Sequence, residues 1–536
     1  MSDQQPSPTP FLDWFGIWPS HRKRDDDGTT WSQDPPQGIE LTQEQARKSP
    51  LFFHKERPWE QNANIHINSM IRSEGRYRLW YGVQRLDDIT RSYTCYAESD
   101  DGFEWHRPEL GLCDWDGSTH NNILAEGRDI PLGFVFEDPN GPPAERFKAV
   151  DATSRFFRDG RHDPEMDSNS YKELIIARDL GDVSAVEKAK GIEIRQQLHG
   201  ATSPDGIHWQ TLDEPVIDVG TTQLDTHNLC IWDPHERQYV AYMRGHIDRR
   251  RLVRRADGPS FTGLGTIRFC LMQDPVDPLD DDIYTPCYTP YPGDQQRYLM
   301  FPAIYHRIAS TADIQLAVSR DSHTWLRPFR EPIVDLTYEG GKYGQIYSSP
   351  NLIVDGDEWR LPFSGYQRTH DFLDRGKTYP EDGEFRWAIW QPDRLAGLEA
   401  KDEGRITLIE RPCHGCELLL NYRTAPDGWI KVEIVQTIHT PPQPVEAYPS
   451  FDIDEVEIMS GDELVHAVRF NGSSDLSALK GGKCRPMLLP FQSAAPLGLD
   501  LTMRIGIIGA GIFSLAAALG LRRRGPRSGR PWSLYR

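Results

Sequence analysis

The chain repeats one short motif, a β-rich run followed by a Ser/Asp/Gly turn that ends on tryptophan. Residues 99–105 read SDDGFEW, residues 203–209 read SPDGIHW, and residues 319–325 read SRDSHTW, a weaker copy. Aspartate accepts hydrogen bonds from nearby backbone N–H groups, glycine permits positive φ, and tryptophan covers the turn with apolar surface. Three copies of one supersecondary unit predict a fold built from repeats.

A second recurring unit, two strands joined by a tight turn, lies between these motifs. Five such pairs are present: residues 65–71 with 77–81, 133–136 with 147–150, 228–232 with 239–242, 285–288 with 298–301, and 351–354 with 359–363. A third strand follows each pair, and in the third and fifth pairs it is expected at residues 268–272 and 385–390. We expect an all-β fold with a five-bladed β-propeller, because radial packing hides the edges of such units. A β-sandwich is the alternative, but it does not explain the repeated internal order.

The repeats also predict how the chain divides into domains. We expect a disordered or extended lead-in over residues 1–58, with a short helix at residues 42–48, and the five-bladed β-propeller over residues 59–410. A small β-sandwich is expected over residues 411–490, followed by a tail over residues 491–536. The 41 prolines, 44 glycines and 56 aromatic residues (15 Trp, 20 Tyr, 21 Phe) suit a turn-rich all-β chain.

Charge and cysteine usage restrict the partners and the compartment. The formal net charge of −20 argues against a nucleic-acid partner, because an acidic surface repels phosphates. The first 13 residues are polar and proline-rich rather than a signal peptide, and the eight scattered cysteines suit reduced thiols. These features predict a cytoplasmic protein. The CHGC run at residues 413–416 has metal-ligand spacing, but an isolated pair favours an ordinary loop, so no metal or cofactor is expected. The oligomeric state stays open.

The tail carries a glycine motif. Residues 503–514 read MRIGIIGAGIFS and resemble the start of a dinucleotide-binding flavoprotein domain, with Ser514 in place of the third glycine. The chain stops at Arg536 and has no acidic residue after Asp500, so one βαβ unit would barely be complete. We therefore expect no flavin site and interpret the tail as a gene-model fusion. A membrane anchor is the alternative, but 17 residues are short for a bilayer core of ~30 Å.

In a propeller the innermost strands line a central channel, so chemistry is expected in the loops that lead into them. These loops contain the acidic residues Glu60, Asp129, Asp225, Asp282 and Glu339. Carboxylates that converge from different blades are what glycoside hydrolysis requires: one protonates the leaving oxygen and another acts as nucleophile or as base for water.

Several stretches resemble the family 32/43-type five-bladed glycoside hydrolases, and more closely a largely uncharacterised group described as family 32 N-terminal-like. They are residues 96–102 (YAESDDG), 107–112 (RPELGL), 121–123 (NNI), 225–228 (DTHN), 232–234 (WDP) and 474–479 (SDLSAL). The resemblance covers roughly residues 59–482. It implies a carbohydrate ligand and a catalytic set of two Asp and one Glu. In family 32 a DPNG motif carries the nucleophile, but here Asp138 of the DPNG at 138–141 aligns with the Asp233-Pro234 turn, which predicts a hairpin turn.

Three carboxylates are the candidate catalytic residues. Asp225 is the first choice because it precedes the third pair beside His227 and Asn228, although an Asx turn explains it equally well. Glu339 is proposed as the acid, because glycines flank it and let it approach a ligand; a solvated loop carboxylate is the alternative. Asp129 could orient the sugar, and plain surface exposure is its alternative.

Five further residues are candidates for substrate binding, each with a structural alternative. His66 and His227 would face the channel or serve as core histidines. Asn228, Arg244 and Tyr347 would clamp or stack on a sugar, or would pack within the blades. The leading hypothesis is an enzyme that cleaves the glycosidic bond of a furanoside or other small glycoside by carboxylate catalysis; the alternative is a non-catalytic carbohydrate-binding or scaffold propeller.

Overall fold

The computed structural model describes the chain as two compact units, one of Gln45–Ile389 and one of Met1–Glu44 with Trp390–Arg536. The described residues are 8–88, 91–127, 129–163, 165–166, 168–179, 181–225, 227–293, 297–370, 382–400, 402, 404–409, 411–412, 417–436, 448, 450–479, 483–491 and 504–508. Within these ranges the fold is nearly all β, and no helix combines the length and apolar character needed to cross a membrane.

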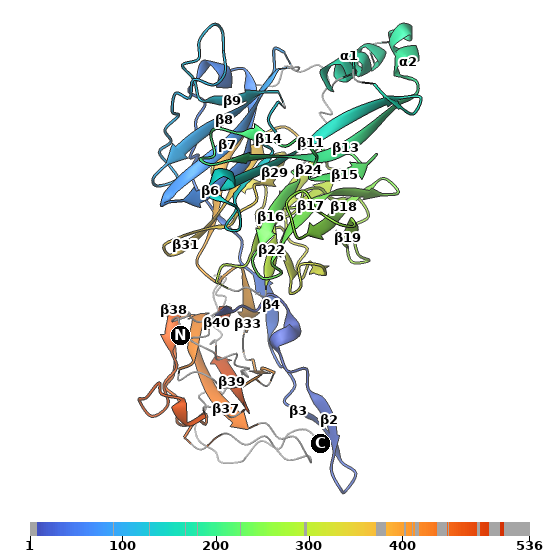
Figure 1. The fold of residues 1–536 in the computed structure, drawn as a ribbon. Helices are drawn as coiled ribbons and strands as arrows, with labels where there is room; N and C mark the ends of the chain where they lie inside the picture. Colours follow the sequence, from blue (N-terminus) through green and yellow to red (C-terminus); the bar gives the residue numbers. More distant parts are fainter. Residues whose placement is uncertain are drawn as a thin grey trace. The chain divides into compact units, whose positions relative to one another are not determined.

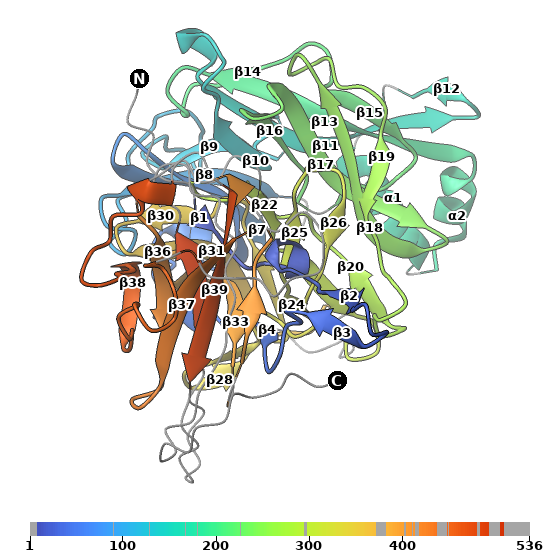
Figure 2. The same cartoon turned by 90° about the horizontal axis from the view of Figure 1, so that it is seen from below.

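The Gln45–Ile389 unit has sheets in a propeller-like arrangement (Figure 1), and their strands pair antiparallel except for β24 with β29. The first sheet contains β6 (Ala63–Ser73), β7 (Arg76–Arg85), β8 (Ser92–Ser99) and β9 (Ile123–Glu126). The second contains β10 (Phe134–Glu137), β11 (Phe147–Arg158), β12 (Arg161–His162), β13 (Ile192–Ser203), β14 (Gln210–Thr211) and β15 (Ile217–Gly220). Figure 2 shows this sheet beside the third, which contains β16 (Leu229–Asp233), β17 (Gln238–Ile247), β18 (Arg250–Gly258) and β19 (Arg268–Leu271).

Two further sheets and a small hairpin complete this unit. The fourth sheet contains β21 (Tyr288–Pro290), β22 (Tyr298–Met300), β25 (Ala317–Ser319) and β26 (Trp325–Leu326). An eight-stranded sheet contains β20 (Asp281–Ile283), β23 (Ala303–His306), β24 (Thr311–Ile314), β29 (Gln345–Ser348), β30 (Ile353–Asp355), β31 (Glu358–Tyr366), β32 (Glu384–Trp390) and β5 (Arg47–Lys48). The small hairpin pairs β27 (Thr337–Tyr338) with β28 (Gly341–Lys342).

The five predicted strand pairs are confirmed as antiparallel hairpins: β6–β7, β10–β11, β16–β17, β21–β22 and β30–β31. The first and last of these sheets meet, because the backbone N–H of Ile67 in β6 donates to Ser364 Oγ of β31 at 3.0 Å. On its other side β6 holds the second sheet: Ser69 Oγ donates to the carbonyl oxygen of Val135 in β10 at 2.6 Å. The strand β6 therefore contacts both the eight-stranded sheet and the second sheet.

Two helices interrupt the second sheet and were not expected from the sequence. They are α1 (Ser168–Asp179) and α2 (Val183–Ala189), inserted between β12 and β13 (Figure 1). Asp182 caps α2, since its carboxylate accepts a hydrogen bond from the backbone N–H of Ser184 at 2.8 Å.

The Ser/Asp/Gly/Trp turns are architectural, as predicted. In the second copy, Asp205 Oδ1 accepts from the backbone N–H of Ile207 and of His208 at 2.9 and 2.8 Å. Gly206 has φ of +80°, the left-handed region that favours glycine. Its carbonyl oxygen accepts from the indoles of Trp209, in the same turn, and of Trp80, in β7 of the first sheet, both at 3.0 Å. The turn at residues 203–209 is thus held by its own tryptophan and by a neighbouring sheet.

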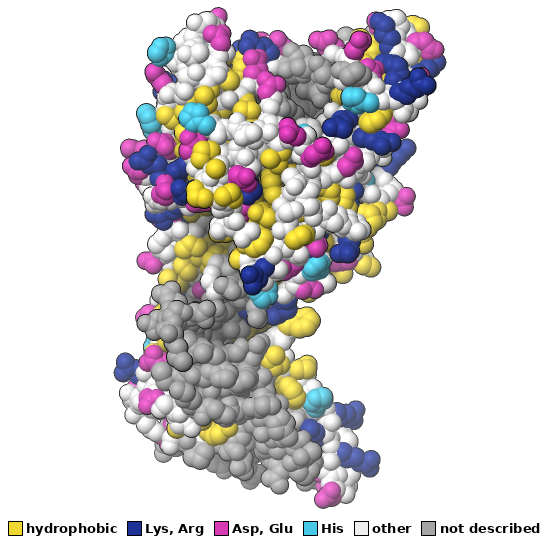
Figure 3. Space-filling model, viewed as in Figure 1, with side chains coloured by type: hydrophobic (Ala, Val, Ile, Leu, Met, Phe, Trp, Pro, Cys, Tyr) yellow, Lys and Arg dark blue, Asp and Glu magenta, His cyan; other side chains and the backbone are white. Residues whose placement is uncertain are grey.

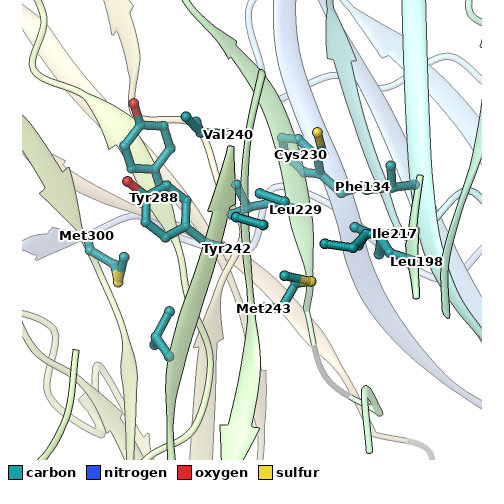
Figure 4. Close-up of a cluster of buried hydrophobic side chains, with 14 of the residues drawn as sticks. Phe134, Leu198, Ile217, Leu229, Cys230, Val240, Tyr242, Met243, Tyr288 and Met300 are labelled. Carbon is teal, nitrogen blue, oxygen red and sulfur yellow. The ribbon is translucent and has the colours of Figure 1, made fainter. Parts of the chain in front are cut away.

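The surface of this unit is mixed in charge, and its core lies between the sheets. On the face seen in Figure 3, acidic and basic side chains are interspersed. One buried cluster joins the second, third and fourth sheets through side chains that Figure 4 labels, such as Leu198, Leu229 and Met300. Within it, the rings of Tyr242 and Tyr288 stack with centroids 4.6 Å apart. Such dry inter-sheet packing is the main stabilising term in a fold of this kind.

The second unit combines both ends of the chain. One of its sheets contains β1 (Pro8–Thr9), β4 (Glu40–Gln43), β33 (Ala396–Glu399), β36 (Leu419–Arg423), β38 (Asp462–Ala467) and β40 (Arg504–Ile508). The other contains β34 (Ile406–Thr407), β35 (Arg411–Pro412), β37 (Trp429–Gln436) and β39 (Lys483–Phe491). A separate hairpin pairs β2 (His21–Arg24) with β3 (Thr30–Gln33). One apolar cluster includes residues of both sheets, among them Leu398, Leu420 and Val432.

Two expectations for the chain ends can be compared with this unit. The short helix predicted at residues 42–48 is wrong: these residues enter β4 and β5, because strands almost 350 residues later, β33 and β32, pair with them. The lead-in expected to be extended or disordered carries the strands β1 to β5. The glycine motif from Gly509 to Ser514 and the CHGC run lie outside the described residues, whereas the strand before that motif is β40.

Candidate functional site

A cavity of about 530 Å³ opens where the first strands of the sheets approach one another. Strands and loops of all the sheets described above in the Gln45–Ile389 unit contribute to its lining. The lining residues are Asn64, His66, Asn68, Gly82, Val83, Gln84, Ser92, Tyr93, Thr94, Gly127, Gly133, Asp151, Leu224, Asp225, His227, Asn228, Tyr284, Thr285, Gln345, Tyr347, Ser364, Tyr366, Arg368 and His370. Amides, hydroxyls and aromatic rings dominate this lining, and such groups suit a polyhydroxylated ligand.

Asp225 is in this cavity, at the predicted place just before β16. Its carboxylate is 59% exposed and forms an ion pair with Arg244 of β17, whose side chain is 2% exposed. Arg244 is therefore a partner of the candidate catalytic residue.

Asp151 is a second carboxylate in the cavity, and sequence reasoning missed it. It belongs to β11, and its Oδ1 accepts from the backbone N–H of Ala152 at 2.7 Å. The absence of a side chain at Gly133 makes room for it, because a Cβ there would lie 2.6 Å from Asp151 Oδ1. Among the described residues that line the cavity, Asp151 and Asp225 are the only carboxylates.

The two predicted histidines both line the cavity, in different settings. His227 donates through Nε2 to the carbonyl oxygen of Ile67 in β6 at 3.0 Å, which links the third sheet to the first. Burial lowers the pKa of His227, and the Ile67 carbonyl and the charge of Asp151 oppose that shift. A neutral ring that spans two sheets matches the alternative of a core histidine. His66 lies against Gly82, where a Cβ would come within 2.1 Å of the imidazole.

Asn228 and Tyr347, two further predicted binding residues, also line the cavity and form hydrogen bonds with neighbouring residues. Asn228 is buried, donates to the carbonyl oxygen of Leu224 at 3.1 Å and accepts from the backbone N–H of Arg244 at 3.1 Å. Its amide thereby orders the loop that carries Asp225. The Tyr347 hydroxyl donates to Gln345 Oε1 at 2.7 Å, and burial raises the pKa of this phenol.

The structure does not bring Glu339 or Asp129 into the cavity. Glu339 is exposed in the turn between β27 and β28, because these short strands pair with each other and carry the glycine-flanked loop outward. Asp129 is also exposed, and neither residue is part of the cavity lining.

The remaining acidic candidates are buried in ion pairs. Glu60 is fully buried and accepts from Tyr81 and Arg107 at 2.5 and 2.8 Å. Asp282 is fully buried between Arg250 and Arg307. Both stabilise the fold rather than face a ligand.

Asp138 occupies a hairpin turn, as predicted. It follows β10, its Oδ1 accepts from the backbone N–H of Asn140 at 2.9 Å, and its other oxygen accepts from Lys148 and Tyr239. These partners use both oxygens of a buried carboxylate, so Asp138 is not available as a nucleophile.

The described residues contain no cluster of three or more His, Cys, Asp or Glu that could hold a metal ion. Five cysteines in the described ranges, at positions 95, 113, 230, 270 and 287, are free thiols.

No protein-family model and no curated protein matches the chain. Solved structures do align with it. An α-L-arabinofuranosidase from Podospora anserina, in complex with cellotriose, aligns at 11% identity and a TM-score of 0.41 over 66% of this chain and 98% of its own. A β-fructofuranosidase from Schwanniomyces occidentalis, complexed with fructosyl-erythritol, aligns at 10% identity and a TM-score of 0.39 over 86% and 98%.

Proposed function

We propose that this protein cleaves the glycosidic bond of a glycoside such as a furanoside by carboxylate catalysis in the cavity of about 530 Å³, called the central cavity below. The observation that carries the proposal is the pair Asp151 and Asp225, contributed by two different sheets to one polar cavity. Two carboxylates that flank one ligand are the minimal equipment for glycoside hydrolysis.

The surroundings of the two carboxylates suggest separate roles. Asp225, paired with Arg244, would act as the anion that activates water or attacks the sugar. Asp151 is less accessible, packs against Gly133, and would protonate the leaving oxygen. In this scheme Asp151 takes the acid role for which the sequence had suggested Glu339. Rings such as Tyr284 and Tyr366 would provide apolar surfaces for the sugar.

A non-catalytic carbohydrate-binding protein is the competing function. The observation in its favour is that Glu339 and Asp129 are not part of the cavity lining, so a third converging carboxylate is not supplied by the predicted set.

We also propose two finer features of the architecture. The strands β29, β31, β32 and β5 would serve as a fifth blade beside the four smaller sheets, because they continue the same order of adjacent antiparallel strands. The two sheets of the second unit would form a β-sandwich around their shared apolar cluster.

A panel of aryl furanosides and pyranosides, assayed with the wild type and the variants Asp225→Asn and Asp151→Asn, tests the function. Loss of an acid or base should lower kcat by roughly 10²- to 10⁴-fold in each variant. Glu339→Gln is the matched control, since it removes an exposed carboxylate outside the cavity, and it should retain wild-type activity. Full activity of both aspartate variants would reject the proposal, and an inactive Glu339→Gln would restore the assignment made from sequence. Sugar binding without turnover in the wild type would favour the non-catalytic function.

A further inference from the structure

A second cavity, of about 830 Å³, lies beside the first and is lined by arginines. Its lining comprises Thr221, Thr222, Gln223, Arg244, His246, Arg249, Arg251, Tyr305 and Arg307. We call it the arginine pocket. Its described lining includes four guanidinium groups and no carboxylate, in a chain whose net charge is −20.

Carboxylates near the arginine pocket neutralise only part of this charge. Asp225 pairs with Arg244, and Asp282 pairs with Arg307 and with Arg250 behind the lining. Among the described residues, Arg249 and Arg251 have no carboxylate partner within ion-pair distance, so positive charge remains in the pocket.

Several donors in the arginine pocket are also unused. Arg244 Nε and Arg251 Nη1 are buried, and neither has a hydrogen-bond partner among the described residues. Arg251 is held between two aromatic rings, with its guanidinium carbon 4.3 Å from the Tyr284 ring centroid and 5.1 Å from that of Tyr305. Stacking fixes the plane of a guanidinium and leaves its edge free to bind an oxyanion.

Burial and the arginine charges together keep one lining residue, His246, neutral. His246 accepts a hydrogen bond from Arg244 Nη2 at 3.2 Å, so its Nε2 is unprotonated. Burial, with the charges of Arg244 and Arg251, lowers the pKa of His246 to about 4. The neutral His246 leaves the surplus charge on the arginines.

The arginine pocket and the central cavity share a wall. Arg244 lines the arginine pocket and pairs with Asp225, which lines the central cavity. Tyr284 lines the central cavity, and Arg251 stacks on it from the arginine pocket. A ligand in the central cavity is therefore within reach of the arginines.

We propose that the arginine pocket binds the anionic group of an acidic saccharide, a carboxylate, sulfate or phosphate, whose sugar ring occupies the central cavity. This assignment rests on the proposed function, because it specifies the substrate class of the same site. Guanidinium groups bind each of these anions through paired hydrogen bonds.

Isothermal titration with galactose, galacturonate, galactose 6-phosphate and galactose 6-sulfate tests the proposal and distinguishes the three anions. At least one charged sugar should bind the wild type about tenfold or more tightly than galactose, as expected for a charge-assisted hydrogen bond. Arg251→Gln and Arg249→Gln should remove that preference. Arg249 is exposed, so the second variant is expected to fold even if loss of the stacked Arg251 destabilises the first. Arg268→Gln, an exposed arginine of β19 outside the pocket, is the control and should bind like the wild type.

Equal affinity for neutral and charged sugars, or an unchanged preference in Arg249→Gln, would overturn the proposal. Hydrolysis and anion recognition can fail separately. If the protein prefers charged sugars but hydrolyses none, the anion site is supported and the proposed hydrolysis is rejected. If it hydrolyses neutral glycosides and shows no preference for anions, the hydrolysis is supported and the anion site is rejected.

Discussion

The indole Nε1 of Trp80, in β7, donates a 3.0 Å hydrogen bond to the carbonyl oxygen of Gly206, in the turn that follows β13. The same contact joins Trp387 of β32 to Gly102 at 3.0 Å. In the weakest copy of the motif, the Tyr242 hydroxyl takes this place and donates to the carbonyl oxygen of Ser322 at 2.7 Å. The repeated turn is thus an attachment point for the neighbouring sheet.

Replacing Trp80 by phenylalanine should destabilise the Gln45–Ile389 unit. The indole is fully buried, so its loss removes a hydrogen bond and leaves a cavity, at a combined cost of about 1–3 kcal/mol. Thermal unfolding should show a lower Tm than the wild type. Phe269→Leu, which changes a half-exposed ring of the same unit, should leave Tm nearly unchanged. Equal Tm values for all three proteins would contradict this role for Trp80.

Gly206→Ala separates close packing from backbone strain. Gly206 and Gly75 both have φ of +80°, but a Cβ at Gly206 would lie 2.9 Å from Trp80 Cζ2, whereas nothing lies within 4 Å at Gly75. Both variants carry the cost of a left-handed alanine, about 1 kcal/mol, and only Gly206→Ala must also displace the indole. The free energy of unfolding, measured with denaturant, should therefore be lower for Gly206→Ala than for Gly75→Ala. The reverse order would refute the packing argument.

Gly133→Ala tests whether the position of Asp151 matters for activity. The added methyl group would occupy the space of the carboxylate, 2.6 Å from its Oδ1, and should push Asp151 out of place. Since a misplaced acid is a poor catalyst, the activity of Gly133→Ala should fall nearly as far as that of Asp151→Asn. Circular dichroism would show whether the fold is retained. Normal turnover by a folded Gly133→Ala protein would argue against Asp151 as the acid.

The stability of the Gln45–Ile389 unit should fall as the pH rises from about 6.5 to about 9. His306 donates to Asp281 at 2.6 Å and to Asp313 at 3.0 Å, and the Asp313 hydrogen bond, opposed by burial, raises its pKa to about 9. Because the folded state holds this proton more tightly than the unfolded state, its contribution is complete below the unfolded pKa and lost above the folded one. The free energy of unfolding should drop by roughly 3 kcal/mol across this window.

His306→Gln should flatten that dependence. The control is His120→Gln, which removes a histidine whose side chain is 79% exposed in a surface pair with Glu109 and should keep the wild-type profile. A wild-type slope in His306→Gln would show that other groups cause the loss of stability.

The hairpins and turns were predictable because their signals are local. Apolar residues alternate in β6 and β7, and a short Ser/Asp/Gly turn explains its own hydrogen bonds. The strand β18 was missed because its sequence, RRLVRRADG, is basic rather than apolar. One of its arginines is buried against a carboxylate from the turn between β16 and β17: Arg255, 2% exposed, pairs with Glu236 at 2.8 Å.

The candidate site was predictable only in part, for a related reason. Asp225 lies in a loop before a strand, where the repeat order draws attention to it. Asp151 lies inside β11, between the buried Val150 and Ala152, and an aspartate within a strand was the signal that could have revealed it. The exclusion of Glu339 from the cavity lining depends on the local pairing of β27 and β28, two strands of two residues each, and so short a pairing leaves no clear pattern.

The pairing of β5 with β32 constrains how the chain can fold during its synthesis. Lys48 lies opposite Ala388 in this ladder, so β5 has no pairing partner until the chain has grown by about 340 further residues. At a synthesis rate of about 5–20 residues per second, that interval is tens of seconds. The sheets in between can form as they emerge, but β5 keeps an open edge until β32 has left the ribosome. A nascent chain stalled before residue 384 should therefore be vulnerable to proteases and to aggregation, even when most of the unit has been made.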